Sequence, residues 1–244
     1  MQSKGPLFLI ALVFVFSTAC GGARRPPVAG GQNQELSHCL QLASQKKYKE
    51  SIECLEVFKS RYPSGEAASE ADLMIADTYY RQHEYLLSAE SYQDFIRANP
   101  TDPKVDYAYH RSGLAYLKEN PKPIDRDQQY IDLAVQNFHT VVEYFPNSPY
   151  ASVALSEYRK ALSRQAKKHF YVGRFYYKYG EYLSAIGRFE EIVAHFPDSG
   201  YDEKSFNYLI SAYKKTNQKD RAEAALAAFA DRFPRSVKKM KGKV

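Results

Sequence analysis

The chain has 244 residues, of which 14% are aromatic and 25% charged, and its formal net charge is +6 at pH 7. This length allows one large core or a small array of repeats, and it leaves no residues for a catalytic domain beside such an array. The positive excess is concentrated at the C-terminus, because residues 235–244 hold five basic residues and no acidic one. A nucleic-acid-binding protein more often spreads basic residues over its folded face, so nucleic acid is not expected as a partner. We interpret residues 235–244 as a basic tail that is solvated or contacts acidic partners or anionic lipid head groups.

The N-terminal residues have the pattern of a secretory signal peptide. Lys4 precedes an unbroken apolar run over residues 7–16, and small residues then lead to Cys20. The run is too short to span a membrane as a helix. The end of this segment, STAC, resembles a bacterial lipobox, although serine stands three residues before the cysteine, where leucine is usual. We therefore predict a cleaved signal peptide at 1–19 and lipidation of Cys20; the alternative is an ordinary signal with an incidental cysteine.

Residues 20–33 are predicted to be the lipidated cysteine and a flexible tether, since they are rich in glycine and proline and have no hydrophobic period. The two other cysteines, Cys39 and Cys54, would lie in an oxidising compartment if the signal peptide is functional. A disulfide between them is one alternative. Two buried free thiols are the alternative that we favour.

Five segments of helical period follow, and each is closed by a proline. The prolines are Pro63, Pro100, Pro146, Pro197 and Pro234. Twelve residues before them stand small residues: Ser51, Ser88, Ala134, Ala185 and Ala222. Eight and five residues before them stand large apolar residues: Leu55, Tyr92, Phe138, Phe189 and Leu226, then Phe58, Phe95, Val141, Ile192 and Phe229. Positions three or four apart share a helix face, so each segment is predicted to be an amphipathic helix that ends near its proline.

A second helix is predicted before each of these. It carries a small residue followed three positions later by a large one, at 39 and 42, 76 and 79, 113 and 116, 173 and 176, and 210 and 213; isoleucine replaces the small residue only at 210. This order resembles the tetratricopeptide repeat. We predict an all-α fold, a superhelical array of about five such hairpins at approximately 34–64, 67–101, 104–147, 165–198 and 201–234. The extra residues before Gly173 contain no helix breaker and predict one long helix, or two abutting ones, between the third and fourth hairpins.

Several features together resemble one family. They are the lipobox-like cysteine, the divergent repeats, the loop Asp125-Arg126-Asp127-x-Gln129 in the third hairpin, and the phrases YFPNSPYA and FYYKYGEYLSAIGRFEEIVAHFPDS. From about residue 34 to 234 the chain resembles the BamD/ComL family of lipoproteins of the outer-membrane β-barrel assembly machinery. The resemblance implies a lipid anchor on the periplasmic face of the outer membrane, and Gly21 in place of aspartate fits outer-membrane sorting. N-acyl and S-diacylglycerol groups on Cys20 would be the only attached groups, with no other cofactor.

The resemblance also implies the partners. These would be the periplasmic domains of a BamA-type insertase, other lipoproteins of the machinery, unfolded outer-membrane protein precursors and outer-membrane lipid through the acyl anchor. The N-terminal repeats would face the precursor and the C-terminal repeats the insertase. The alternative is a repeat scaffold in cell division or peptidoglycan coordination, although such proteins usually carry a coiled-coil segment and no heptads follow Cys20.

No catalytic or metal-binding pattern occurs in the sequence. The histidines are scattered, with no HExxH and no paired ligand spacing. Asp125 and Asp127 flank Arg126, which favours a surface loop held by ion pairs over acid–base chemistry. We therefore expect a protein that is not an enzyme.

The concave side of the array is the candidate site, because the first helices of tetratricopeptide hairpins line it. The register predicts these groove residues: Asp77, Tyr80, Arg81, Tyr107, His110, Phe170, Arg174, Tyr177, Lys178 and Lys214, with Lys118, Asn207 and Lys215 beside them. Aromatic rings beside cations suit an extended peptide that ends in an aromatic residue and a carboxylate. The competing interpretation is that the rings cap the core and the cations are solvated.

Overall fold

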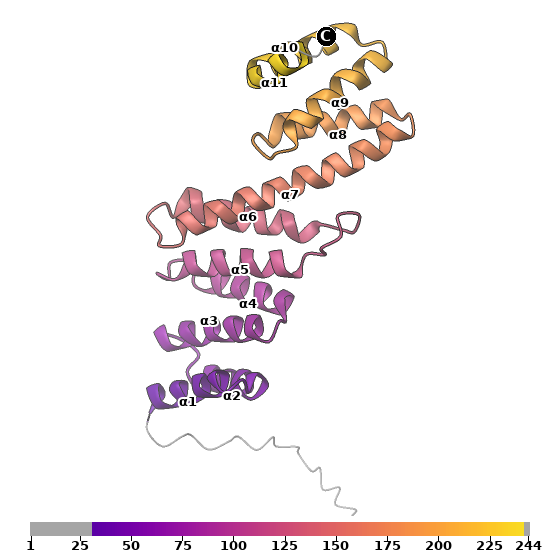
Figure 1. Ribbon diagram of the computed structural model, residues 1–244. Coiled ribbons are helices and arrows are strands. Elements are labelled where there is room, and N and C mark those ends of the chain that lie inside the picture. The colour runs from indigo at the N-terminus through magenta and orange to yellow at the C-terminus, as the bar shows by residue number, and fades with distance from the viewer. Residues whose placement is uncertain (1–30, 242–244) are drawn as a thin grey trace, which may run out of the picture.

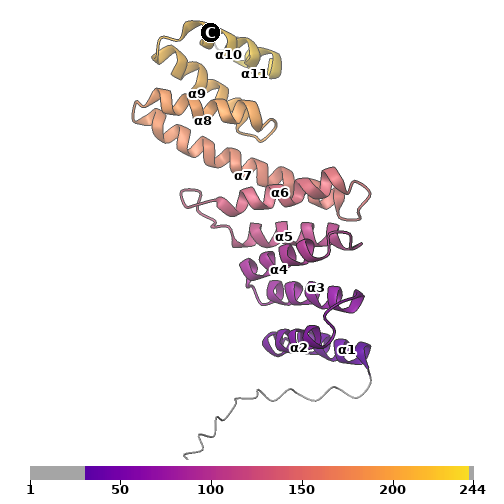
Figure 2. The same cartoon turned by 180° about the vertical axis from the view of Figure 1, so that it is seen from behind.

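The computed structural model describes residues 31–241, which form eleven α-helices and no strand (Figures 1 and 2). The helices are α1 (Gln32–Ser44), α2 (Tyr48–Arg61), α3 (Glu66–Arg81), α4 (Tyr85–Ala98), α5 (Val105–Glu119), α6 (Gln129–Tyr144), α7 (Ala151–Lys178), α8 (Tyr182–His195), α9 (Asp202–Lys215), α10 (Lys219–Arg232) and α11 (Pro234–Lys241). They stack in chain order, each against the next, from α1 at one end to α10 and α11 at the other. The predicted all-α array of helical hairpins is confirmed.

The spacing of small and large residues explains how the two helices of a hairpin pack. A Cβ atom on Gly113 would lie 2.7 Å from Cε1 of Phe138, and one on Gly173 would lie 2.8 Å from Cε1 of Phe189. Each ring therefore occupies the space that a side chain on the facing helix would need. The close approach of α5 to α6, and of α7 to α8, depends on these two glycines.

The predicted core register is confirmed at fourteen of its fifteen positions, which are buried. The exception is Leu226, which is 49% exposed. The other hairpins have Cys39, Ala76, Gly113 or Gly173 opposite the large residue, whereas the last hairpin has Ile210. Ile210 itself packs against Phe206 and Phe229 and fills the space between the helices, so the prediction of a buried Leu226 was wrong.

Four of the five hairpins turn in the same way. The turn residues Lys46, His83, Gly180 and Asn217 all have left-handed φ angles, between 59° and 83°. The backbone N–H of the following residue then donates to a carbonyl near the end of the first helix, as from Lys47 to Leu42 at 2.9 Å and from Gln218 to Tyr213 at 2.9 Å. This is the hydrogen bond of a Schellman motif. The third hairpin differs, because residues 120–128 form a longer loop between α5 and α6.

A single helix joins the two halves of the array. α7 has 28 residues; its first part packs against α6 and its second part against α8 (Figure 1). Of the two alternatives for this segment, one long helix is the correct one. Within residues 31–241, none of the helices combines the length and the apolar character needed to cross a bilayer.

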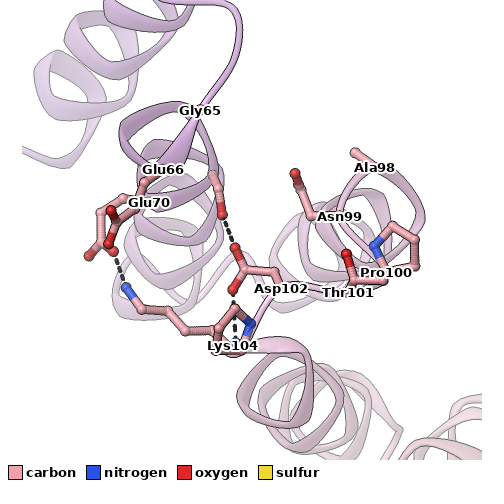
Figure 3. A pocket seen from close by; sticks show the side chains of 11 residues that line it. Gly65, Glu66, Glu70, Ala98, Asn99, Pro100, Thr101, Asp102 and Lys104 are labelled. Carbon is pink, nitrogen blue, oxygen red and sulfur yellow. Dashed lines mark hydrogen bonds and ion pairs between the residues drawn. The ribbon is translucent and has the colours of Figure 1, made fainter.

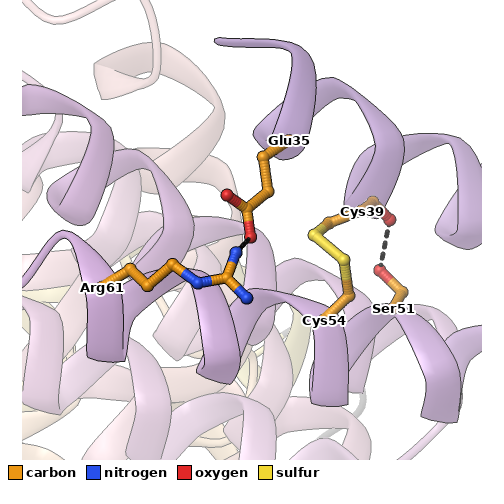
Figure 4. Close-up of a disulfide and its surroundings, with 5 residues drawn as sticks. All are labelled: Glu35, Cys39, Ser51, Cys54 and Arg61. Carbon is orange, nitrogen blue, oxygen red and sulfur yellow. Dashed lines mark hydrogen bonds and ion pairs between the residues drawn. A yellow bond between two sulfur atoms is a disulfide. The ribbon is translucent and has the colours of Figure 1, made fainter. Parts of the chain in front are cut away.

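The first hairpin contains a disulfide between Cys39 and Cys54, with the two Cα atoms 5.4 Å apart (Figure 4). The prediction of two free thiols was wrong. Cys39 is the small residue of α1 that faces α2, and Cys54 adjoins the core residue Leu55, so both lie where the helices meet. Nearby, the Ser51 hydroxyl donates to the Cys39 carbonyl at 2.8 Å, and the buried Glu35 pairs with Arg61 (Figure 4).

The helical structure continues beyond the last of the five prolines. α10 ends at Arg232, and Pro234 is the first residue of α11. Proline is well suited to a first helical position, where its missing N–H removes no helical hydrogen bond. The described part of the basic segment, up to Lys241, is therefore helical rather than extended.

Candidate peptide-binding site

A pocket of about 690 Å³ lies between α7, α9 and the 120–128 loop. Its lining is aromatic and cationic and includes no acidic residue: Ile124, Lys167, Phe170, Tyr171, Arg174, Phe175, Tyr177, Lys178, Tyr201, Lys204 and Tyr208. We refer to it as the aromatic–cationic pocket. Its volume lies within the range of ordinary ligand sites.

Helical periodicity explains why these side chains gather. Positions 167, 170, 171, 174, 175 and 178 are three or four residues apart and form one face of α7. Lys204 and Tyr208 are four residues apart on α9, and Tyr201 is the residue before that helix. Since α9 also contacts α7, the two sets face each other across the pocket.

The floor of the pocket is a cluster of packed rings. The buried Phe170 ring lies 5.4 Å from Tyr201 and 5.7 Å from Tyr208, measured between ring centroids. Tyr177 meets Tyr208 edge to face at 5.1 Å, and its hydroxyl lies 2.6 Å from Oγ of Ser211. These contacts fix the ring orientations, so the floor is preorganised for an aromatic ligand.

The cations lie around this floor. The Arg174 guanidinium is 5.9 Å from the Phe170 ring, and the Lys204 ammonium is 5.9 Å from the Tyr201 ring. Arg174, Lys178 and Lys204 are exposed and none has a carboxylate in the lining of the pocket. An aromatic floor with cations at the rim can bind a ring and an adjacent carboxylate together.

The predicted groove residues do not form one continuous surface. Phe170, Arg174, Tyr177 and Lys178 meet in the aromatic–cationic pocket. Two others line a separate pocket of about 400 Å³ between α3, α5 and the start of α7; they are Asp77 and Tyr107. The remaining four line neither pocket: Tyr80, Arg81, His110 and Lys214.

Asp77 already has partners within the protein. Its carboxylate accepts hydrogen bonds from the hydroxyls of Tyr92 and of Tyr107, the latter at 2.7 Å, and lies 3.3 Å from the Arg111 guanidinium. Arg111 in turn lies over the Tyr80 ring at 4.2 Å. Burial, with Asp77 beside it, raises the pKa of both tyrosines above the usual range. The hydrogen bonds and the ion pair are all made by Oδ1 of Asp77, and they stabilise the junction between the second and third hairpins.

His110 lies inside the array rather than on its surface. It is 7% exposed and its ring stacks on Tyr150 with 5.3 Å between centroids. Neither ring nitrogen has a hydrogen-bond partner, and burial lowers the pKa of His110. By contrast, Arg81 and Lys214 are exposed at positions away from the aromatic–cationic pocket.

Seven residues of the pocket were not predicted from the sequence: Ile124, Lys167, Tyr171, Phe175, Tyr201, Lys204 and Tyr208. Widening the same face of α7 by one position would have found Tyr171 and Phe175, and extending it by one turn toward the N-terminus would have found Lys167. Ile124 carries no such signal, because it lies in an irregular loop.

A further pocket, of about 660 Å³, lies near the N-terminal end, between the start of α3 and the connection from α4 to α5 (Figure 3). Most of its charged groups already have partners within the protein. Lys104 pairs with Glu70, and Asp102 accepts hydrogen bonds from the Ser69 hydroxyl and, at 2.8 Å, from the Lys104 backbone N–H. These internal pairs make it a weaker candidate for a charged ligand. Among the described residues, no three histidine, cysteine or acidic side chains are grouped as metal ligands would be.

The chain is similar to several known proteins. Two proteins named outer membrane protein assembly factor BamD are similar to the chain. The one from Neisseria gonorrhoeae is 29% identical over 78% of this chain and 74% of its own, and the one from Pasteurella multocida is 27% identical over 93% and 90%. Among solved structures, the TPR2AB domain of yeast Sti1 in its complex with pHSP90 is 15% identical, with a TM-score of 0.42, over 83% of this chain and 78% of that chain.

The sequence model of one family, YfiO, described as outer membrane lipoprotein, matches residues 32–228. This match spans all five hairpins except the end of α10. It confirms the family that the sequence motifs predicted. The chain therefore belongs to the YfiO (BamD) family of outer membrane lipoproteins.

Proposed function

We propose that this protein is a lipid-anchored periplasmic scaffold for the assembly of outer-membrane β-barrel proteins. It would hold the periplasmic domains of a BamA-type insertase, adjoin other lipoproteins of that machinery and receive unfolded barrel precursors. Family membership and the assembly-factor name of its relatives support the general role. We infer a binding role without catalysis, because the candidate site offers rings and cations rather than an acid–base pair.

The aromatic–cationic pocket is the observation that carries the proposed binding of precursors. A precursor segment that ends in an aromatic residue would place its ring on Phe170 and Tyr208 and its carboxylate near Arg174 or Lys178. The resemblance to the family implies the N-terminal repeats for this task. The geometry favours α7 and α9. The N-terminal pocket between α3 and the α4–α5 connection is lined by acidic residues, and the one cation among the described residues that line it, Lys104, is paired with Glu70, so it suits a carboxylate less well.

A peptide that ends in a free phenylalanine tests this proposal. It should bind more tightly than the same peptide with an amidated C-terminus. The difference in binding free energy should be only about 0.5–1.5 kcal/mol, because exposed ion pairs contribute little, and added salt should reduce it. Arg174→Ala should remove most of that difference, as measured by calorimetry.

Arg81→Ala is the matched control, since Arg81 is an exposed arginine outside the pocket. Equal binding of the two peptides would contradict the proposal. A loss on Arg81→Ala but not on Arg174→Ala would move the site to the N-terminal repeats.

The insertase needs a different surface. Tyr179, just after α7, and Leu183, in the first turn of α8, are 64% and 70% exposed and do not line the pocket. Large exposed apolar side chains often anchor protein interfaces. Insertase binding should therefore survive Arg174→Ala and weaken on Leu183→Asp. Affinity purification from detergent-solubilised envelope would identify the partner, and recovery of peptidoglycan-coordinating proteins without an insertase would favour the alternative scaffold role.

The proposed anchor, Cys20, lies outside the described residues. Cys20→Ser should abolish acylation and release the protein from membranes, because all the acyl chains of the proposed anchor are attached to this cysteine. Fractionation of envelopes and fatty-acid labelling measure this result. An unlabelled wild-type protein, or unchanged fractionation of the variant, would rule out the lipid anchor.

A further inference from the structure

The 120–128 loop of the third hairpin replaces the short turn of the other four and lies beside α7 (Figures 1 and 2). Three of its residues are hydrogen-bonded to one another inside the loop: Asn120, Pro121 and Gln128. The Gln128 side chain is buried, and its amide nitrogen donates to the carbonyls of Pro121 and Pro123 at 3.2 and 3.0 Å. Asn120 donates to the Gln128 side-chain oxygen at 2.9 Å. The loop is therefore curled around one glutamine.

Two cations of α7 hold this curled loop from outside. Arg164 donates through Nη2 to the carbonyls of Pro121 and Lys122, at 2.6 and 2.8 Å. Its Nε donates to the Gln128 side-chain oxygen at 2.9 Å. Lys168 donates to the carbonyls of Ile124 and Arg126, at 3.1 and 3.0 Å. All these acceptors are neutral oxygens of the loop, so the two cations bind the loop itself rather than a carboxylate.

The same loop supplies one wall of the aromatic–cationic pocket. Ile124 is the only aliphatic residue among those that line the pocket, and it comes from the loop rather than from α7 or α9. Lys168 holds the carbonyl of Ile124 itself, and the neighbouring Lys167 lines the pocket with it. An aliphatic side chain in the same pocket as packed rings gives a ligand additional apolar surface.

We propose that Arg164 and Lys168 are positioning residues, which fix the 120–128 loop on α7 and so place Ile124 as the aliphatic wall of the pocket. This inference rests on the proposed peptide-binding role of the pocket. Neither cation is among the residues that line the pocket. Their effect on a ligand would therefore be indirect, through the loop.

The test compares three variants of the full chain: Arg164→Ala/Lys168→Ala, Ile124→Ala and, as a matched control, Arg159→Ala/Lys160→Ala. The control removes one arginine and one lysine that are exposed on α7 away from the loop. The first variant should increase amide exchange in residues 120–128 at least about tenfold, with α8 and α9 unchanged. It should also weaken binding of the peptide that ends in free phenylalanine about tenfold. Ile124→Ala should weaken this binding to a similar extent, because the loss of apolar contact in a pocket usually has an effect of about this size. Ile124→Ala should leave the loop amides protected, and the control should change neither measurement.

A second measurement needs no peptide. A thiol introduced by Ile124→Cys should react slowly with a labelling reagent, and adding Arg164→Ala/Lys168→Ala should make it react faster. The inference would be overturned if Arg164→Ala/Lys168→Ala changed neither the amide exchange of the loop nor the labelling rate. It would also be overturned if this variant had a loosened loop but full affinity for the peptide while Ile124→Ala bound the peptide weakly. Failure of the wild-type protein to bind the peptide would instead refute the proposed function, and the labelling rates would still decide whether the two cations position Ile124.

Discussion

A single position decides how closely the two helices of each hairpin approach. Gly113 and Gly173 leave the space that the rings of Phe138 and Phe189 fill. Ile210 fills the corresponding space itself, and Leu226 is displaced into solvent. The side chains at these facing positions compete for one volume, because protein interiors are close-packed.

Ala185 tests this account in the fourth hairpin. It is fully buried on α8, so Ala185→Leu should lower the free energy of unfolding by about 1–3 kcal/mol through overpacking. Ala194 is exposed on the same helix, and Ala194→Leu should change stability little. Chemical denaturation of both variants measures the difference, and equal midpoints would show that the assigned face of α8 is wrong.

The sequence was most informative about the helices and their core positions. The facing positions repeat with each hairpin, so the core of α2, α4, α6 and α8 could be predicted from spacing alone. Leu226 could not, since its burial depends on the residue opposite. The disulfide was missed because Cys54 lies one position from the repeating core residue Leu55, and the register did not show that it also faces α1.

The disulfide should stabilise the first hairpin independently of the rest. It joins residues separated by 15 positions, and closing a loop of that size in the unfolded chain contributes about 3 kcal/mol. Reductant should therefore speed amide exchange in α1 and α2 while leaving α8 and α9 unchanged.

The variant Cys39→Ser/Cys54→Ser is the control for this experiment. It should exchange rapidly in α1 and α2 with or without reductant. If reductant leaves the exchange of the wild-type hairpin unchanged, the covalent link contributes nothing to its stability.

Over the whole molecule, charge and aromatic surface are unevenly distributed. The N-terminal pockets contain acidic groups that are paired or hydrogen-bonded, at Glu70, Asp77 and Asp102. The pocket of α7 and α9 contains cations and rings without acids. From the sequence, the residues of the N-terminal pockets and those of the aromatic–cationic pocket were predicted to line one groove. The repeat register shows which face of a helix a residue occupies, but it does not show which side chains will form hydrogen bonds or ion pairs with that residue. Ile124 was beyond prediction, since it reaches the pocket only through the folded 120–128 loop.

Cross-linking can show directly where a precursor terminus binds on the array. A photo-reactive residue in place of Phe175, in the aromatic–cationic pocket, should cross-link a peptide that ends in free phenylalanine. The same residue in place of Leu87, which is exposed on α4, should not. Mass spectrometry would map the cross-link to the last residues of the peptide. Equal cross-linking at both positions, or cross-linking at Leu87 alone, would contradict the claim that α7 and α9 receive the precursor.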